Sequence, residues 1–172
     1  MNIAETERLL MRTLELGDAH FYLELLNTPA FIANIGDRQI RSVQAARESI
    51  RNGPLAMQAA RGHSIYLVEL KADRRPIGMS GLIKRDALDD VDLGYAFLPA
   101  YFGMGYAYEA ALAVLHHARH QIGLARVLAI TSPANEASAR VLRKLGMRLE
   151  KTVQLTPGEA NTRLYRLDFP LD

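Results

Sequence analysis

The 172-residue sequence contains no cysteine, no tryptophan and no long run of apolar residues. The absence of cysteine excludes disulfides, thiolate metal sites and a cysteine nucleophile. No apolar stretch approaches the roughly 18 residues that a membrane span requires. Acidic residues stand near the N-terminus, where a signal peptide has a basic start and an apolar run. We therefore expect a cytoplasmic protein that neither spans nor binds a membrane.

Charge of one sign is also lacking, because 21 Lys and Arg nearly balance 19 Asp and Glu and leave a net charge of +2. This balance argues against a nucleic-acid partner, which usually requires a strong basic field. Neither repeats nor a linker-like segment interrupt the chain, whose length suits one ordinary domain. We expect a single domain over residues 1–172 that acts as a monomer or a homodimer.

Hydrophobic periodicity and turn residues predict a mixed α/β (α+β) order. The strands are expected at residues 8–16, 64–70, 76–84, 91–98, 127–130, 147–155 and 163–169. The helices are expected from residue 17 to a stop at 27–29, from 42 to a break at 52–54, and at 55–60, 105–122 and 135–145. The three consecutive strands between residues 64 and 98 predict an antiparallel run.

Two glycines, Gly103 and Gly105, stand between the predicted strand 91–98 and the helix that follows. Glycine lets the backbone approach a ligand closely, and the free N–H groups of a helix start attract anions. Such a loop can bind a pyrophosphate, although a tight turn without a ligand has the same pattern. Tyr108 occupies the third glycine position of the dinucleotide fingerprint, and no Gly-Lys-Ser/Thr follows. A nicotinamide or ATP site is therefore disfavoured.

A second polar motif, Asn-x-x-Ser, begins at Asn135 and leads into a basic helix that ends in Lys-Leu-Gly. Asn135 and Ser138 are residue types that cap helices, so capping alone would account for them. Arg140, Arg143 and Lys144 follow at helical spacing, and they suit either a phosphate contact or a solvated helix face.

Together, Gly94-Tyr95, the Gly-x-Gly-Tyr-Ala loop at 103–107 and the Asn-x-x-Ser motif resemble the GNAT superfamily of N-acetyltransferases. Within it, the chain resembles the branch that acetylates the N-termini of ribosomal proteins, as does its opening at residues 6–12. The resemblance implies a twisted, mostly antiparallel mixed sheet whose central strands splay, flanked by helices. It also implies acetyl-coenzyme A as cosubstrate, no metal, and an amine-bearing small molecule or a peptide N-terminus as acceptor.

The same resemblance assigns individual residues. The residues expected to bind the pyrophosphate are Gly103, Met104, Gly105, Tyr106, Ala107 and Tyr108. Those expected along the pantetheine arm are Phe97, Leu98, Asn135 and Ser138, whereas helical spacing and not the resemblance suggests Arg140 and Arg143 for the terminal phosphate. The chain departs from the family at Phe102, which replaces Gln or Arg and is expected to weaken phosphate binding. It also has Leu142 where many members have a tyrosine acid, which shifts that role to Ser138.

Attack on a thioester requires a neutral amine, yet alkyl amines have a pKa of about 10.4 and are protonated at neutral pH. Asp92 is the first candidate to accept the proton and Glu69 the second, either of them through a water. Asp92 and Tyr95 are three positions apart on one strand, so a bulge would be needed to bring both to one site. Backbone N–H groups near Ala96 and Phe97 are expected to stabilise the oxyanion.

Other interpretations remain open. His116 and His120 are four residues apart on a predicted helix, but no third ligand suggests a metal site. The chain could also be a regulatory module that binds coenzyme A without catalysis. A third alternative is an acetylase of aminoacyl-tRNA.

Overall fold

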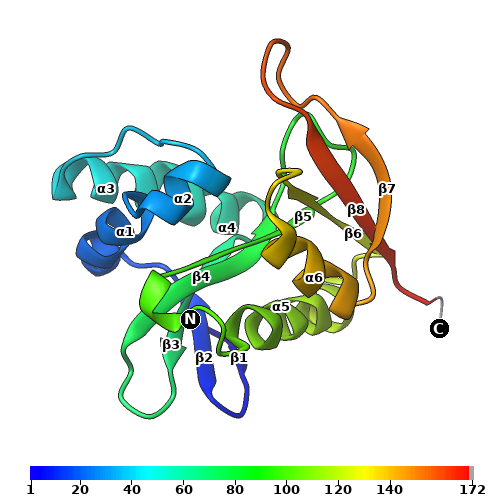
Figure 1. Ribbon diagram of the computed structural model, residues 1–172. Helices are drawn as coiled ribbons and strands as arrows, with labels where there is room; N and C mark the ends of the chain where they lie inside the picture. Colours follow the sequence, from blue (N-terminus) through cyan, green and yellow to red (C-terminus); the bar gives the residue numbers. More distant parts are fainter. Residues whose placement is uncertain (171–172) are drawn as a thin grey trace.

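The computed structural model describes residues 1–170 and contains one eight-stranded sheet with the order β1-β2-β3-β4-β5-β6-β8-β7 (Figure 1). All neighbouring strands are antiparallel except β5 and β6, which are parallel. The strands are β1 Asn2–Glu5, β2 Leu9–Thr13, β3 Ile65–Leu70, β4 Pro76–Ile83, β5 Asp92–Phe97, β6 Arg126–Thr131, β7 Arg148–Val153 and β8 Thr162–Asp168. The expected mixed, mostly antiparallel fold is confirmed.

Helices cover both faces of the sheet. They are α1 Ala19–Leu26, α2 Pro29–Asn34, α3 Val43–Ile50, α4 Ala56–Arg61, α5 Tyr106–His117 and α6 Glu136–Lys144. Helices α1 to α4 lie on one face of β2 to β5, whereas α5 and α6 lie on the other face (Figure 1).

Strand alternation divides the core between these two faces. On β3, Val68 packs with Val114 of α5, whereas Leu67 packs with Leu25 of α1 and Ile50 of α3. All five side chains are fully buried. The two helical layers therefore hold the first half of the sheet rigidly from both sides.

The central strands splay, as expected. β5 pairs with β6 only through Asp92 with Leu128 and Leu93 with Ala129. On its other edge β5 pairs with β4 without a register shift along six residue pairs. The part of β5 from residue 94 onward therefore leaves β6 and opens a gap between the two halves of the sheet.

The structure differs from the expected elements at three places. Strand β1 was not expected. The segment at Thr28-Pro29 also begins a helix, because the Thr28 side chain accepts the Phe31 N–H and Pro29 occupies the first helical position. The expected break at residues 52–54 is a π-helical segment, Arg51–Leu55, that contains Pro54 and joins α3 to α4. Its wider turn accommodates a residue without an N–H group.

Candidate functional site

The start of α5 has the properties of an anion-binding loop. Gly103 and Gly105 adopt left-handed backbone conformations, with φ of +72° and +82°. Gly105 is the N-cap residue, and no side chain caps the helix behind it. The loop residues from Phe102 to Gly105 are exposed. The N–H groups of the first helical turn therefore point toward solvent without a side-chain partner.

Arg8 braces this loop and was not identified from the sequence. Its Nη1 donates to the Met104 carbonyl at 2.9 Å, and its guanidinium carbon lies 4.3 Å from the centre of the Tyr106 ring. Its Nη2 forms a 2.6 Å ion pair with Glu109 of α5. Burial would raise the pKa of Glu109, but hydrogen bonds from Thr6 and Arg8 outweigh it and lower that pKa. The negative charge thereby holds Arg8 against the loop.

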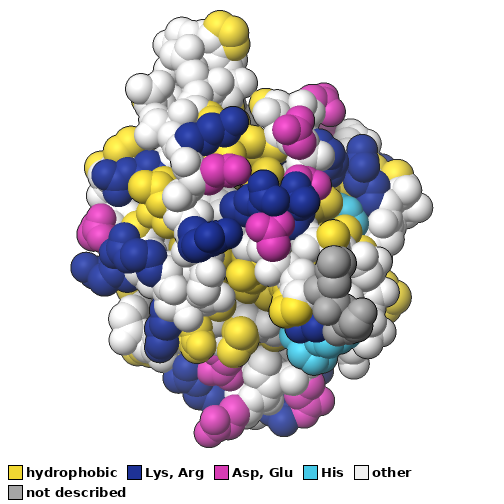
Figure 2. Space-filling view, turned by 90° about the vertical axis from the view of Figure 1, so that its right-hand side faces the viewer, with side chains coloured by type: hydrophobic (Ala, Val, Ile, Leu, Met, Phe, Trp, Pro, Cys, Tyr) yellow, Lys and Arg dark blue, Asp and Glu magenta, His cyan; other side chains and the backbone are white. Residues whose placement is uncertain are grey.

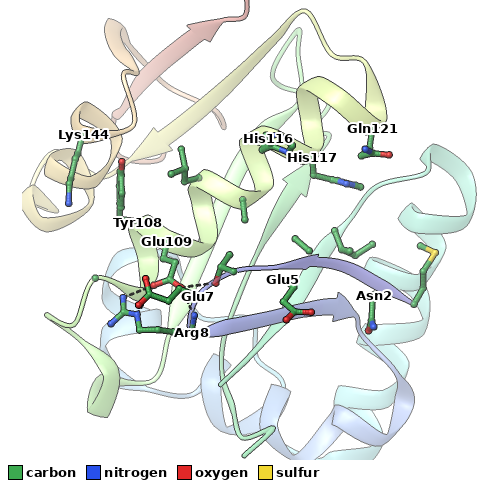
Figure 3. Close-up of a pocket in the computed structure, with 17 residues that line it drawn as sticks. Asn2, Glu5, Glu7, Arg8, Tyr108, Glu109, His116, His117, Gln121 and Lys144 are labelled. Carbon is green, nitrogen blue, oxygen red and sulfur yellow. Dashed lines mark hydrogen bonds and ion pairs between the residues drawn. The ribbon is translucent and has the colours of Figure 1, made fainter. Parts of the chain in front are cut away.

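A groove of about 830 Å³ runs from this loop along α5 and β1 (Figure 3). At the loop end, Tyr108 and Lys144 lie side by side, and the Lys144 ammonium is 4.1 Å from the centre of the Tyr108 ring. Lys144 of α6 thus places a positive charge against the first turn of α5. At the other end the groove reaches His116 and His117.

The start of α6 is organised differently, because Asn135 caps it. The Asn135 Oδ1 accepts the Ser138 N–H at 3.1 Å. The Ser138 hydroxyl takes no part in this cap and lies 2.7 Å from the Tyr95 hydroxyl of β5. Capping therefore accounts for Asn135 but not for the Ser138 side chain.

Tyr95 is the second residue of the site that the sequence did not single out as functional. The Ser138 carbonyl oxygen, 3.3 Å away, is a second acceptor within reach of the same phenol proton. Burial raises the pKa of the phenol to about 12, although the hydrogen bond with Ser138 acts in the opposite direction. The phenol is therefore fully protonated at neutral pH.

The open edge of β5 is formed by alternate peptide groups. The Leu98 N–H donates to the Ile77 carbonyl of β4 at 2.9 Å, so the peptide N–H of Leu98 points toward β4 and away from the gap. Antiparallel alternation directs the Ala96 N–H to β4 as well, and it directs the peptide groups of Tyr95 and Phe97 toward the gap. Of the two backbone N–H groups expected to stabilise the oxyanion, that of Phe97 points toward the gap and that of Ala96 points toward β4.

Asp92 lies on the opposite face of the sheet from Tyr95, and β5 has no bulge against β4 that would bring them together. Its carboxylate is fully buried and accepts hydrogen bonds from Arg85 Nε at 3.1 and 3.2 Å. Burial raises the pKa of Asp92 to about 6, against the opposing effect of Arg85. Along the strand, Asp92 and Tyr95 are about 10 Å apart.

Glu69 is separated from Asp92. It pairs with Pro76 at one end of β4, whereas Asp92 pairs with Ile83 at the other, about 20 Å away along the strand. Its Oε1 accepts from Arg12 at 3.0 Å, and Arg74 lies 2.8 Å from its Oε2. The structure therefore does not bring the two candidate bases together.

The remaining α6 residues differ in their surroundings. Arg143 forms a 2.6 Å ion pair with Glu136, and Arg140 is exposed. Figure 2 shows the side of the molecule with α6, β7 and β8, where Lys and Arg side chains gather among acidic ones. Leu142 is 1% exposed within the core, so α6 provides no phenol at that position. Phe102 is half exposed at the edge of the α5 loop.

Within residues 1–170, no cluster of three or more His, Asp or Glu side chains is arranged to hold a metal ion. His116 and His120 lie with ring centroids 4.4 Å apart. In the same part of the chain, no helix combines the length and the apolar character needed to cross a membrane.

Comparison with known proteins gives consistent matches. Residues 8–148 match the model of the acetyltransferase (GNAT) domain. The uncharacterised protein YkkB of Bacillus subtilis is 32% identical over 95 residues, which are 54% of this chain and 55% of YkkB. The chain thus matches only about half the length of this relative.

Two solved structures share the fold. An acetyltransferase of the GNAT family from Bacillus anthracis is 26% identical, with a TM-score of 0.79 and coverage of 98% of both chains. RimL, a ribosomal L7/L12 alpha-N-protein acetyltransferase solved in complex with coenzyme A, is 16% identical. Its TM-score is 0.83 with 98% of both chains covered, and at this identity the likeness concerns the fold alone.

Proposed function

Because the chain belongs to the GNAT acetyltransferase family, we propose that it transfers an acetyl group from acetyl-coenzyme A to a primary amine. The amine belongs to a protein N-terminus or to a small molecule, and it attacks the thioester directly. One observation carries the proposal: β5 separates from β6 beyond Leu93, its separated part carries Tyr95, which is hydrogen-bonded to Ser138, and the same strand leads to the uncapped start of α5.

The residues present fit such a cosubstrate. The first turn of α5 offers N–H groups to a pyrophosphate, and the left-handed Gly105 keeps that approach free of a side chain. The gap-facing peptide of Phe97 offers a strand edge to the amide groups of a pantetheine arm. The cations of α6, Arg140, Arg143 and Lys144, lie on the helix that faces α5 and suit a terminal phosphate.

Asp92 is the residue that we propose as proton acceptor, acting through a water. With a pKa of about 6, its carboxylate is ionised at neutral pH and remains basic enough to take a proton. It lies on the face of β5 opposite Tyr95, whereas Ser138 is hydrogen-bonded to Tyr95 on the face covered by α5 and α6. The amine would thus approach from one face while the sulfur leaves toward the other. Glu69 is the second candidate.

Ser138 is proposed to donate a hydrogen bond to the leaving sulfur. As the N–C bond forms, the C–S bond breaks and its electron pair stays on sulfur. The amine nitrogen loses one proton to the carboxylate or water, and the thiolate takes one up from solvent. The gap-facing Phe97 N–H is proposed to stabilise the oxyanion.

A thiol-release assay tests this function. Acetyl-coenzyme A is supplied with short peptides bearing free N-termini, with amino acids and with polyamines, and calorimetry measures cosubstrate binding separately. We expect binding in the micromolar range and thiol release that depends on one class of amine. No binding at millimolar concentration contradicts the proposal. Binding without turnover on any amine would instead favour a regulatory module, and acetylation of charged tRNA would identify the third alternative.

A further inference from the structure

The Tyr95–Ser138 hydrogen bond crosses the gap in the sheet, and the proposed function does not by itself explain it. We propose that Tyr95 is a positioning residue, which fixes the Ser138 hydroxyl as a hydrogen-bond donor toward the leaving sulfur. This inference rests on the proposed acetyl transfer. It assigns a role to a residue of β5 that acts only through Ser138 of α6.

The position of Tyr95 supports this role. Leu93 is the last residue of β5 that pairs with β6, and Tyr95 follows it by two positions. Tyr95 therefore lies where β5 has separated from β6. Both hydrogen bonds recorded for its hydroxyl in residues 1–170 go to Ser138. The two residues are 43 positions apart: Tyr95 lies on β5, and Ser138 lies on α6, the helix that follows β6. The contact therefore joins the two walls of the gap at the Ser138 side chain.

The direction of the hydrogen bond between the Tyr95 and Ser138 hydroxyls decides whether the Ser138 proton is available to the leaving sulfur. If Ser138 donates to Tyr95, its only proton is occupied and none faces the gap. If Tyr95 donates, the Ser138 oxygen is an acceptor and its own proton is free for another partner. The phenol has one proton, and the Ser138 hydroxyl oxygen at 2.7 Å lies nearer to it than the Ser138 carbonyl oxygen at 3.3 Å. Because a phenol is a stronger hydrogen-bond donor than an alkyl hydroxyl, we infer the second arrangement.

The neighbouring hydroxyl groups do not compete for the phenol. Ser80 stands opposite Tyr95 on β4, and Thr131 ends β6 at the corresponding level across the gap. The hydroxyls of both residues are buried and have no hydrogen-bond partner in the described chain. Buried hydroxyls are normally bonded. Tyr95 therefore engages Ser138 although two other hydroxyls stand on neighbouring strands.

Through Ser138, the Tyr95 hydroxyl acts on the departure of the sulfur leaving group. When the C–S bond breaks, the electron pair moves to sulfur, and the Ser138 O–H donates to the charge that develops there. The Tyr95 O–H donates to the Ser138 oxygen and makes that hydroxyl more polar. The phenol and the serine both keep their protons, and the thiolate is protonated later by solvent.

The first test is Tyr95→Phe, which keeps the ring and removes the hydroxyl. We expect kcat to fall about fivefold to tenfold, the size of one lost hydrogen bond, while KM for acetyl-coenzyme A stays within about twofold. In a Ser138→Ala background, the same substitution should have no further effect on kcat. A purely structural role would instead lower kcat equally in both backgrounds.

Tyr66→Phe is the matched control. Tyr66 is buried on the same face of the sheet, on β3, and its hydroxyl lies 3.4 Å from the Ser64 N–H and has no contact with Ser138. We expect its kcat to equal that of the wild type. Thermal unfolding of every variant shows whether folding is intact.

A second measurement does not depend on how well Tyr95→Phe folds. Incorporation of 3,5-difluorotyrosine at position 95 lowers the pKa of the phenol and preserves its shape. Because an ionised phenol cannot donate, kcat should then fall at alkaline pH where the wild-type kcat does not. Full activity of Tyr95→Phe, or additive effects with Ser138→Ala, would overturn the positioning role while wild-type turnover leaves the proposed function intact. A wild-type protein without turnover on any amine would overturn both.

Discussion

The two helix starts that border the gap, those of α5 and α6, meet the same physical problem in opposite ways. Each leaves four backbone N–H groups without an intrahelical partner. At α5 the N-cap is a glycine, and its exposed loop leaves these groups to solvent. At α6 the Asn135 side chain accepts the Ser138 N–H. The Ser132 and Ala134 carbonyls accept the N–H groups of Asn135 and Glu136. One helix start is thus open to an anion from outside, and most N–H groups of the other are bonded within the protein.

This difference separates binding from chemistry. The α5 loop uses main-chain groups, so its residue identities matter mainly where a side chain would obstruct the approach. The α6 start uses side chains: Asn135 sets the backbone, and the Ser138 hydroxyl is left for Tyr95 and the gap. Substitutions at α5 should therefore change KM for acetyl-coenzyme A, and substitutions at Ser138 should change kcat.

The largest effect on kcat is expected from Asp92→Asn. Asp92 lies on β5 and belongs to neither helix start. In the wild type, kcat should rise with pH through about 6, because the carboxylate must lose its proton before it can accept one. Asp92→Asn should lower kcat about 100-fold at pH 7.5 and remove this rise. Rates between pH 5 and 9 with one amine measure it. An unchanged pH profile would assign proton transfer elsewhere, with Glu69→Gln as the next variant.

Gly105→Val tests the open helix start. The left-handed conformation of Gly105 is strained for a β-branched residue, and a Cβ atom would lie 3.4 Å from Arg8 Nη2. We expect KM for acetyl-coenzyme A to rise about 30-fold with a smaller change in kcat. Gly123→Val is the matched control, since Gly123 has φ of +77° but ends the helical segment after α5, with open space around it. Equal KM values for the two variants would contradict the assignment of the α5 loop.

Ser138→Ala tests the satisfied helix start. The cap depends on the Ser138 backbone N–H, so it survives the substitution, and only the hydroxyl is lost. We expect kcat to fall about tenfold and KM for acetyl-coenzyme A to stay within about twofold. Steady-state kinetics distinguishes this from a binding role, in which KM alone would rise.

Asn135→Ala removes the cap itself. Loss of an N-cap typically costs about 1 kcal/mol, and we expect the free energy of unfolding to fall by about that amount. Urea denaturation measures it. Asn135→Asp keeps an acceptor oxygen and should restore most of the stability. If Asn135→Ala is as stable as the wild type, the cap is not what holds the start of α6.

Lys144→Met has the smallest expected effect. The ammonium group lies against Tyr108 in the first turn of α5, where it adds positive charge to the open helix start. We expect KM for acetyl-coenzyme A to rise about threefold at low salt and less at high salt. Arg143→Met is the comparison, because Arg143 is paired with Glu136. A larger effect of Arg143→Met would show that the terminal phosphate lies farther along α6.

Several features could be predicted because they depend on local sequence. The glycines at 103 and 105 indicated a loop in an unusual backbone conformation, and both have positive φ. The three-residue spacing of Asp92 and Tyr95 predicted opposite faces of one strand, as the regular register shows. Thr28-Pro29 predicts the end of a helix, but the same residue types also begin helices, and here they begin α2.

Other features depend on contacts between distant segments. Arg8 forms an ion pair with Glu109, 101 positions away in the sequence, and no local sequence pattern predicts it. The point at which β5 leaves β6 depends on how the two halves of the sheet twist and pack. No bulge gathers Asp92 and Tyr95 at one site, because β5 keeps a regular register with β4 and its side chains alternate between the two faces.

The sequence by itself determined the order of most strands and helices, the glycine-bearing loop and the capped helix start, because each follows from residues within one or two turns. Only the tertiary structure decided that Tyr95 is hydrogen-bonded to Ser138, that Asp92 is buried beside Arg85, and that Arg8 supports the α5 loop. Those pairings arise when packing brings together segments far apart in the chain. Burial then sets the pKa of each group, which local sequence cannot specify.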